Sequence, residues 1–177
     1  MSTRDSPIEL EMPPTLFEAN PERRKLSASQ RRNEGRWRGS GRDWATPPEL
    51  YEELDAEFTF DLDPCASDRT AKCKHYFTEA EDGLSRHWGM NRVFMNPPYG
   101  RELPRWVEKA KESAKAGALV VGLLPAATDS AWWHEHVVGC GEVRYLRKRP
   151  RFLIYTETGT KWNSPFQPCV IVVWNRG

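Results

Sequence analysis

The chain has 177 residues, of which 38% are hydrophobic and 29% charged, and its formal net charge is +1. This length suits one domain with an appendage, and no apolar run approaches the roughly 20 residues that a membrane span requires. The net charge neither favours nor excludes a polyanionic partner, and the polar N-terminus predicts no secretory signal.

Charge is segregated along the chain. Residues 23–42 carry a net charge of +7, residues 49–82 a net charge of −8, and residues 144–151 contain five basic side chains. Residues 1–42 show no helical or strand periodicity, so we expect a basic, disordered tail before a folded domain at 43–177. Basic segments of this kind favour contacts with phosphates.

The four cysteines include no Cys-x-x-Cys pair. A chain of this size with so few cysteines is not a disulfide scaffold, so we expect reduced thiols and a cytoplasmic setting. The irregular spacing of Cys65, Cys73 and His75 argues against a zinc site, and we expect no bound metal.

The first half of the folded region predicts one helix and several strands. Thr46-Pro-Pro-Glu reads as a capping box with proline at the first helical position, which predicts a helix over residues 47–55. Alternating or apolar runs predict strands over residues 58–62, 75–78 and 93–95.

The second half continues the alternation. Apolar spacing predicts a helix over 104–116 that ends at Gly117, and residues 118–124 are apolar on both faces, as in a central parallel strand. A further helix containing Trp132 and Trp133, and strands over 143–146 and 169–174, complete the pattern. Alternating elements favour an α/β sheet with helices on both faces, where ligands bind beyond the carboxyl ends of the strands.

Asn96-Pro97-Pro98-Tyr99 follows directly after the apolar strand at 93–95. The exocyclic amine of a nucleobase is a poor nucleophile because its lone pair is delocalised into the ring. The Asn96 Oδ1 and the Pro97 carbonyl could accept its N–H bonds and favour a reactive, pyramidal nitrogen. Pro97 and Pro98 fix φ and hold the loop rigid, and Tyr99 could stack on an extruded base. The alternative is a structural strand-to-helix turn.

These motifs resemble those of the phage-type DNA N6-adenine methyltransferases, a compact group that uses S-adenosylmethionine. The resemblance covers residues 43–177 and rests on Asp43-Trp44-Ala-Thr46-Pro47, Asp61-Leu-Asp63-Pro64-Cys-Ala-Ser67, Asp82-Gly-Leu84 with Trp88, Asn96-Pro-Pro-Tyr-Gly100, Leu124-Pro-Ala-Ala-Thr128-Asp129, Arg149-Pro-Arg151-Phe152 and Ser164-Pro-Phe166. It implies a methyltransferase catalytic domain at 43–177 with a Rossmann-like class I methyltransferase fold, an α/β mixed sheet of about seven strands with helices on both faces.

The resemblance also implies a set of cofactor-binding residues. The loop from Asp61 to Ser67 stands where similar enzymes place the first cofactor loop, although it contains no glycine. Helix capping explains Thr46 equally well, and ordinary turns would account for Asp61, Asp63 and Asp82. The residues assigned to S-adenosylmethionine are Trp44, Thr46, Pro47, Asp61, Asp63, Pro64, Phe77 and Asp82.

A third implied set contacts DNA. Phe166 would sandwich the flipped base opposite Tyr99, with Trp162 as a competitor, and Thr128 would line the base pocket. Edge-of-core packing and helix capping are the structural alternatives for these three residues. The residues assigned to DNA phosphates are Lys148, Arg149 and Arg151.

The function implied is methyl transfer from S-adenosylmethionine to adenine N6 in DNA, with Asn96, Pro97, Pro98 and Tyr99 as the catalytic motif. DNA is the expected partner, no membrane is involved, and a monomer of phage or prophage origin is expected. Cytosine N4 or a protein glutamine amide is an alternative acceptor, because both are planar amines. The remaining alternative is a non-catalytic DNA-binding module with a decayed cofactor site.

Overall fold

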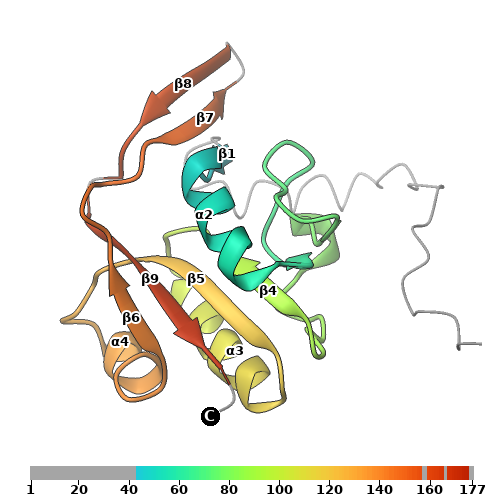
Figure 1. Cartoon of the computed structure of the whole chain (residues 1–177), viewed down its shortest axis with the longest axis vertical. Coiled ribbons are helices and arrows are strands. Elements are labelled where there is room, and N and C mark those ends of the chain that lie inside the picture. Colours follow the sequence, from blue (N-terminus) through green and yellow to red (C-terminus); the bar gives the residue numbers. More distant parts are fainter. Residues whose placement is uncertain (1–42, 157–158, 166, 176–177) are drawn as a thin grey trace, which may run out of the picture.

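The apolar strands pair into two sheets in the computed structural model, which describes residues 43–156, 159–165 and 167–175 (Figure 1). The expected tail at 1–42 and the expected base contact Phe166 lie outside the described residues. In chain order the elements are β1 (Asp43–Ala45), α2 (Pro48–Phe58), β2 (Leu62–Asp63), β3 (His75–Tyr76), η1 (Glu79–Glu81), β4 (Arg92–Met95), α3 (Leu103–Lys115), β5 (Leu119–Pro125), α4 (Ala131–His136), β6 (Glu142–Tyr145), β7 (Phe152–Thr156), β8 (Gly159–Asn163) and β9 (Cys169–Trp174).

The larger sheet is a mixed sheet with the strand order β3-β2-β4-β5-β9-β6. The strands β3, β2, β4 and β5 are parallel, and β9 is antiparallel to both of its neighbours, β5 and β6. The described part of this sheet therefore has six strands in place of the seven or so expected, and the remaining strands form a separate sheet.

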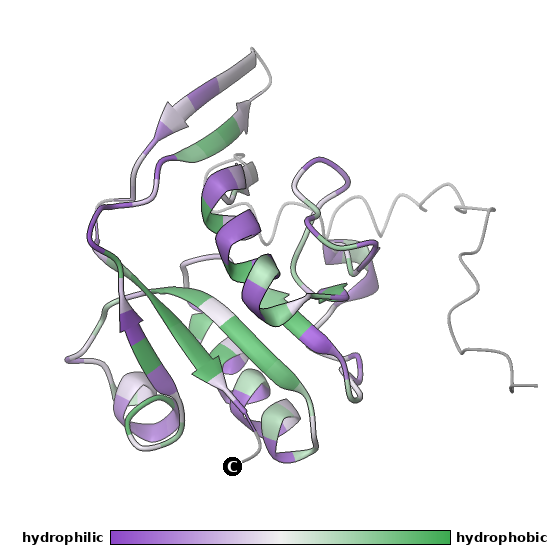
Figure 2. Ribbon diagram, in the orientation of Figure 1, coloured by the Kyte–Doolittle hydropathy of each residue, from purple (hydrophilic) through white to green (hydrophobic). Residues whose placement is uncertain are grey.

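Helices cover both faces of the six-stranded sheet, as the alternation of elements predicted (Figure 1). On β4, Val93 and Met95 face the layer that contains Trp106 of α3, whereas Phe94 faces the layer that contains Phe58 of α2. The strands β5 and β9 are buried along almost their whole length, and Figure 2 shows them as the hydrophobic centre of the fold. This burial on two faces explains their continuous apolar sequences.

Four tryptophans belong to the core on the α3 side of the sheet. Trp88 stacks on Trp106 at a ring-centroid distance of 6.2 Å and donates a 2.9 Å hydrogen bond from Nε1 to the Gly83 carbonyl. Trp174 likewise donates from Nε1, to the His136 carbonyl at 2.8 Å. Much of the unusually high tryptophan content therefore fills the core. The four core tryptophans are Trp88, Trp106, Trp133 and Trp174.

The second sheet has three antiparallel strands in the order β1-β7-β8. The pattern in the sequence did not predict β7 and β8, whose hairpin stands away from the body of the protein (Figure 1). Phe152 of β7 anchors this sheet, because it is buried and packs edge-on against Trp44 of β1 at 5.7 Å. All five residues of β8 are exposed, so this strand has no alternation of buried apolar and exposed polar residues that a sequence pattern could detect.

Two predictions near α2 are wrong. The helix continues to Phe58, and the strand expected over 58–62 is reduced to Leu62–Asp63, because Phe58 packs as the last core residue of α2. The capping box is also wrong, since Pro47 is the N-cap residue and no side chain caps the helix. The later elements match their predictions within about two residues, with Gly117 in the left-handed region (φ 114°) directly after α3.

Among the described glycines, Gly83 has the least space for a side chain, and it provides a test of the packing. A Cβ added at Gly83 would lie 1.9 Å from the Pro64 carbonyl oxygen. We expect Gly83→Ala to lower the free energy of unfolding by about 2 kcal/mol or more, because two backbone segments would have to separate. Denaturant titration measures this change. Gly100→Ala is the matched control, since a Cβ there meets nothing within 4 Å, and equal stability losses for both variants would contradict the prediction.

Candidate functional site

Most of the predicted site residues lie at one edge of the sheet, where the parallel strands have their carboxyl ends. The strand β2 ends at Asp63, β4 ends directly before Asn96, and β5 ends at Pro125. Since β9 is antiparallel to β5, its first residue, Cys169, lies opposite Pro125 at the same edge. Ligands of open α/β sheets bind at this edge, so the predicted catalytic loop stands where a ligand site is expected.

Asn96 is half-buried and held through one end of its amide. Its Nδ2 donates a hydrogen bond to the Thr46 hydroxyl oxygen at 3.1 Å and lies 3.5 Å from the Trp44 carbonyl oxygen. Within the described residues, the Asn96 Oδ1 has no hydrogen-bond partner. The amide therefore keeps a free acceptor at the carboxyl end of β4.

The rest of the predicted catalytic motif lies at the same edge of the sheet. Pro97 is buried and Pro98 half-buried, and Tyr99 follows with 38% of its surface exposed. The Tyr99 hydroxyl donates a 3.1 Å hydrogen bond to the Leu123 carbonyl and lies 3.8 Å from the Cys169 Sγ. Burial raises the pKa of this phenol well above its ordinary value. The ring is thus anchored at its hydroxyl end, while part of its surface faces solvent.

Asp63 organises the loop that follows β2. Its carboxylate accepts hydrogen bonds from the backbone N–H groups of Cys65 (3.4 Å) and Lys72 (3.2 Å), and the residue is only 4% exposed. Burial raises the pKa of Asp63 to about 7. Burial and the adjacent Asp63 also raise the pKa of the Cys65 thiol, which receives a hydrogen bond from the Asn96 backbone N–H. Cys65 thereby links the loop after β2 to the catalytic loop.

Phe77 and Asp82 lie beside the loop that follows β2. The backbone of Phe77 bonds to Asp63 and Ala66 at 2.9 and 3.1 Å, and its ring is half-buried with the Arg86 guanidinium 5.9 Å from its centroid. Asp82 is exposed in a left-handed conformation (φ 50°), and Gly83 next to it packs directly on the Pro64 carbonyl. A partly open aromatic ring and an exposed carboxylate therefore flank the loop after β2.

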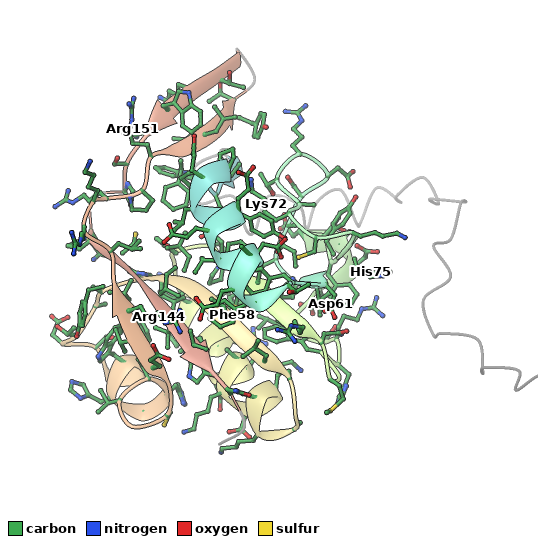
Figure 3. All side chains as sticks on the ribbon, viewed as in Figure 1. Phe58, Asp61, Lys72, His75, Arg144 and Arg151 are labelled. Carbon is green, nitrogen blue, oxygen red and sulfur yellow. The ribbon has the colours of Figure 1, made fainter. Side chains whose placement is uncertain are left out.

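Asp61 is the predicted cofactor residue that the structure does not bring to this edge. Its carboxylate accepts a 2.9 Å hydrogen bond from the backbone N–H of Arg92, the first residue of β4. Asp61 therefore lies at the amino end of the parallel strands, and in Figure 3 it lies below Lys72, at about the height of Phe58 and Arg144. The sequence pattern placed Asp61 near the end of a strand, whereas it precedes β2 and lies away from the other residues predicted to bind the cofactor.

The predicted DNA contacts are exposed around the candidate site. Thr128 follows β5, and Lys148, Arg149 and Arg151 lie in the segment that joins β6 to β7, all with exposed side chains. Figure 3 shows Arg151 at the base of the hairpin. Trp162 is 49% exposed on β8 and pairs with Leu153 of β7. Cationic side chains and an exposed indole thus extend from the sheet edge along the hairpin.

The opposite edge contains a hollow of about 730 Å³, which is lined in part by Arg92 and Arg144. Both cations are already engaged. The Arg92 side chain donates to the Phe58 carbonyl, and Arg144 forms 2.7 Å ion pairs with Glu57 and Glu142. The Glu57–Arg144 pair joins α2 to β6, and each charged residue that lines the hollow already has a partner.

In the described part of the chain, no group of three or more His, Cys, Asp and Glu side chains could hold a metal ion. The same residues contain no helix with the length and apolar character needed to cross a membrane.

The contact between Thr46 and Asn96 is the main feature that the sequence pattern did not predict. Its two residues are 50 positions apart, so no local periodicity connects them. One signal was present, since Pro48 would stand at N2 and lacks one of the two N–H groups, at N2 and N3, that a capping threonine can bond. The sequence contains no comparable signal for the hydrogen bond from the Tyr99 hydroxyl to the Leu123 carbonyl of β5.

The raised pKa of Asp63 predicts a pH dependence of stability. Between pH 4 and 7 the folded chain binds more protons at Asp63 than the unfolded chain does, so the free energy of unfolding falls as pH rises through this window. Asp63→Asn removes the titrating group, so we expect the variant to lack this decrease in the free energy of unfolding. The decrease amounts to a few kcal/mol, because one pKa unit corresponds to about 1.4 kcal/mol. Denaturant titrations of both proteins from pH 4 to 8 measure the effect. Parallel curves would show that Asp63 has an ordinary pKa.

Comparisons with known proteins identify the family. The family model "DNA N-6-adenine-methyltransferase (Dam)" matches residues 37–176. The DNA N-6-adenine-methyltransferase of Haemophilus phage HP1 (strain HP1c1) is 29% identical over 133 residues, which are 74% of this chain and 77% of that protein. The DNA N-6-adenine-methyltransferase of Escherichia phage T1 is 32% identical over 105 residues, which are 58% of this chain and 44% of that protein. The resemblance seen in the sequence motifs is therefore confirmed, and the chain belongs to the DNA N-6-adenine-methyltransferase (Dam) family.

Proposed function

We propose that the chain transfers a methyl group from S-adenosylmethionine to N6 of adenine in DNA, on a Rossmann-like class I methyltransferase fold. Membership of the family and the names of both phage relatives support adenine N6 as the acceptor. The observation that carries the mechanism is the half-buried Asn96, which stands at the carboxyl end of β4 with its Nδ2 bonded and its Oδ1 free.

Asn96 and Pro97 activate the acceptor amine. The adenine amine has two N–H bonds and a lone pair that is delocalised into the ring. When the Asn96 Oδ1 and the Pro97 carbonyl accept these N–H bonds, the nitrogen becomes more pyramidal and its lone pair more available. Buried Pro97 holds the loop in place, and this rigidity matters because a misplacement of about 1 Å costs roughly 10²-fold in rate.

The residues around the loop after β2 fit S-adenosylmethionine. The half-buried Phe77 ring offers a surface for the adenine of the cofactor, and the exposed Asp82 carboxylate can accept a hydrogen bond from its amine. Gly83, next to Asp82, packs against the Pro64 carbonyl. We assign Trp44 and Pro47 to the neighbouring wall of the pocket. When bound, S-adenosylmethionine supplies an electrophilic methyl group on a sulfonium ion. The protein positions the amine so that it attacks this carbon directly.

We assign DNA binding to the exposed basic and aromatic side chains near the hairpin. Lys148, Arg149 and Arg151 contact phosphates, Tyr99 stacks on the flipped base, and Trp162 or Phe166 covers its other side. The exposure of the three basic residues and of part of the Tyr99 ring supports these roles. The net charge of +7 at residues 23–42 supplies further phosphate contacts.

Asn96→Ala tests the proposed reaction. We expect it to lower kcat by about 10²-fold or more, because one of the two acceptors of the amine is lost, with little change in cofactor affinity. Mass spectrometry of nucleosides from DNA incubated with labelled cofactor measures the product. Asn175→Ala, the same change at an exposed residue after β9, is the control. Unchanged turnover of Asn96→Ala, or N4-methylcytosine as the product of the unmodified chain, would contradict the proposal.

Removal of Arg149 and Arg151 tests the DNA surface. We expect the double alanine variant to bind DNA more weakly and to reduce the slope of log Kd against log salt by about two, because two phosphate contacts are lost. Fluorescence anisotropy over a range of salt concentrations measures the slope. The variant Lys111→Ala/Lys115→Ala on α3 removes the same charge elsewhere and should leave the slope near its original value. Equal slopes for both variants would exclude a local contact.

A further inference from the structure

The two ends of the Asn96 amide are chemically different, so its orientation decides what it presents to a substrate. A carbonyl oxygen only accepts hydrogen bonds, whereas the amide Nδ2 only donates them. The Trp44 carbonyl lies 3.5 Å from this Nδ2. Turning the amide over would bring Oδ1 against the carbonyl, with two acceptors face to face. The Trp44 carbonyl therefore favours the orientation with Nδ2 inward and Oδ1 outward.

Thr46 makes the shorter of the two contacts, with 3.1 Å between its hydroxyl oxygen and the Asn96 Nδ2. The residue is 3% exposed, so this hydroxyl is almost fully removed from water. It is not a helix cap, because α2 begins after Pro47 without a side-chain cap. A buried hydroxyl that loses its partner costs free energy, which favours keeping the amide in place.

The backbone on both sides of Thr46 is restrained. The preceding strand β1 pairs with β7 along its whole length, with Ala45 opposite Leu153. Pro47 and Pro48 follow and fix φ. Thr46 is therefore held in place directly after the smaller sheet, and Asn96, directly after β4 of the larger sheet, bonds to it.

We propose that Thr46 is a positioning residue for the methyl transfer, which holds the Asn96 amide so that its Oδ1 faces the substrate amine. This inference rests on the proposed function, because it takes Asn96 as an acceptor of that amine. Thr46 acts through Asn96 and touches no reacting atom. The sequence pattern assigned Thr46 to the cofactor, whereas its hydrogen bond in the structure is to Asn96.

Comparison of Thr46→Val with Thr46→Ser separates the effect of the Thr46 hydroxyl group from the effect of the side chain's shape. Valine replaces the hydroxyl by a methyl group of similar size, and we expect kcat to fall by about 10- to 100-fold, because the amide can then turn away from its productive position. Serine keeps the hydroxyl and should restore most of kcat. The affinity for S-adenosylmethionine, measured by calorimetry, should stay unchanged in both. Ser113→Ala on α3, which removes another buried hydroxyl, is the control and should keep kcat.

Combination with Asn96→Ala tests whether Thr46 acts through Asn96. In that background Thr46→Val should cause no further loss of kcat, since there is no amide left to position. In the ¹⁵N-labelled protein without cofactor, the side-chain amide protons of Asn96 should exchange with water faster in Thr46→Val than in Ser113→Ala. This second readout does not depend on activity.

The outcomes separate this inference from the proposed function. If Asn96→Ala is inactive and Thr46→Val keeps its kcat, the positioning role is wrong and the proposed function stands. If Thr46→Val weakens cofactor binding and its effect on kcat adds to that of Asn96→Ala, Thr46 is a cofactor ligand and the inference is overturned. If Asn96→Ala is itself active, both the proposed function and the positioning role fail.

Discussion

The hydrogen bond from the Asn96 Nδ2 to the Thr46 hydroxyl connects the two sheets at the point where the chemistry is proposed. Asn96 follows β4 of the six-stranded sheet, and Thr46 follows β1 of the three-stranded sheet. The position of the amide therefore depends on the packing of both sheets. The short strand β1 thus contributes to the candidate site, because the Trp44 carbonyl and the adjacent Thr46 both contact the Asn96 side chain.

Three loops at one sheet edge are tied together by buried polar contacts. The Asp63 carboxylate closes the loop after β2, and the Cys65 thiol connects that loop to the backbone of Asn96. The Tyr99 hydroxyl reaches the Leu123 carbonyl of β5. Each contact places a polar group in a region of low dielectric, where losing the partner is costly, so the loops hold one another in place. Catalysis by positioning requires this kind of rigidity.

The sequence predicted the strands that are buried on both faces and the residues that follow them. The apolar runs of β4, β5 and β9 and the amphipathic spacing of α3 are strong local signals, since burial alone determines them. The strand β8 was not predicted, because it is exposed throughout and carries no hydrophobic alternation. The strand β7 was also missed, although Phe152 and Ile154 on it are buried in alternation. Asp61 was misplaced for a related reason, since Phe58 and Phe60 match a strand pattern although Phe58 ends α2.

By itself the sequence determined the α/β class, the position of the Asn96-Pro97-Pro98-Tyr99 motif after β4 and the loops with which that motif shares an edge. These features follow from local periodicity and from the rule that parallel strands end at a common edge. Only the tertiary structure decided which end of the Asn96 amide is free, that Thr46 contacts Asn96 and does not cap α2, and that Asp63 is buried while Asp61 lies at the far edge. Each of these depends on contacts between residues far apart in the chain, and a local pattern contains no information about the partner of a side chain.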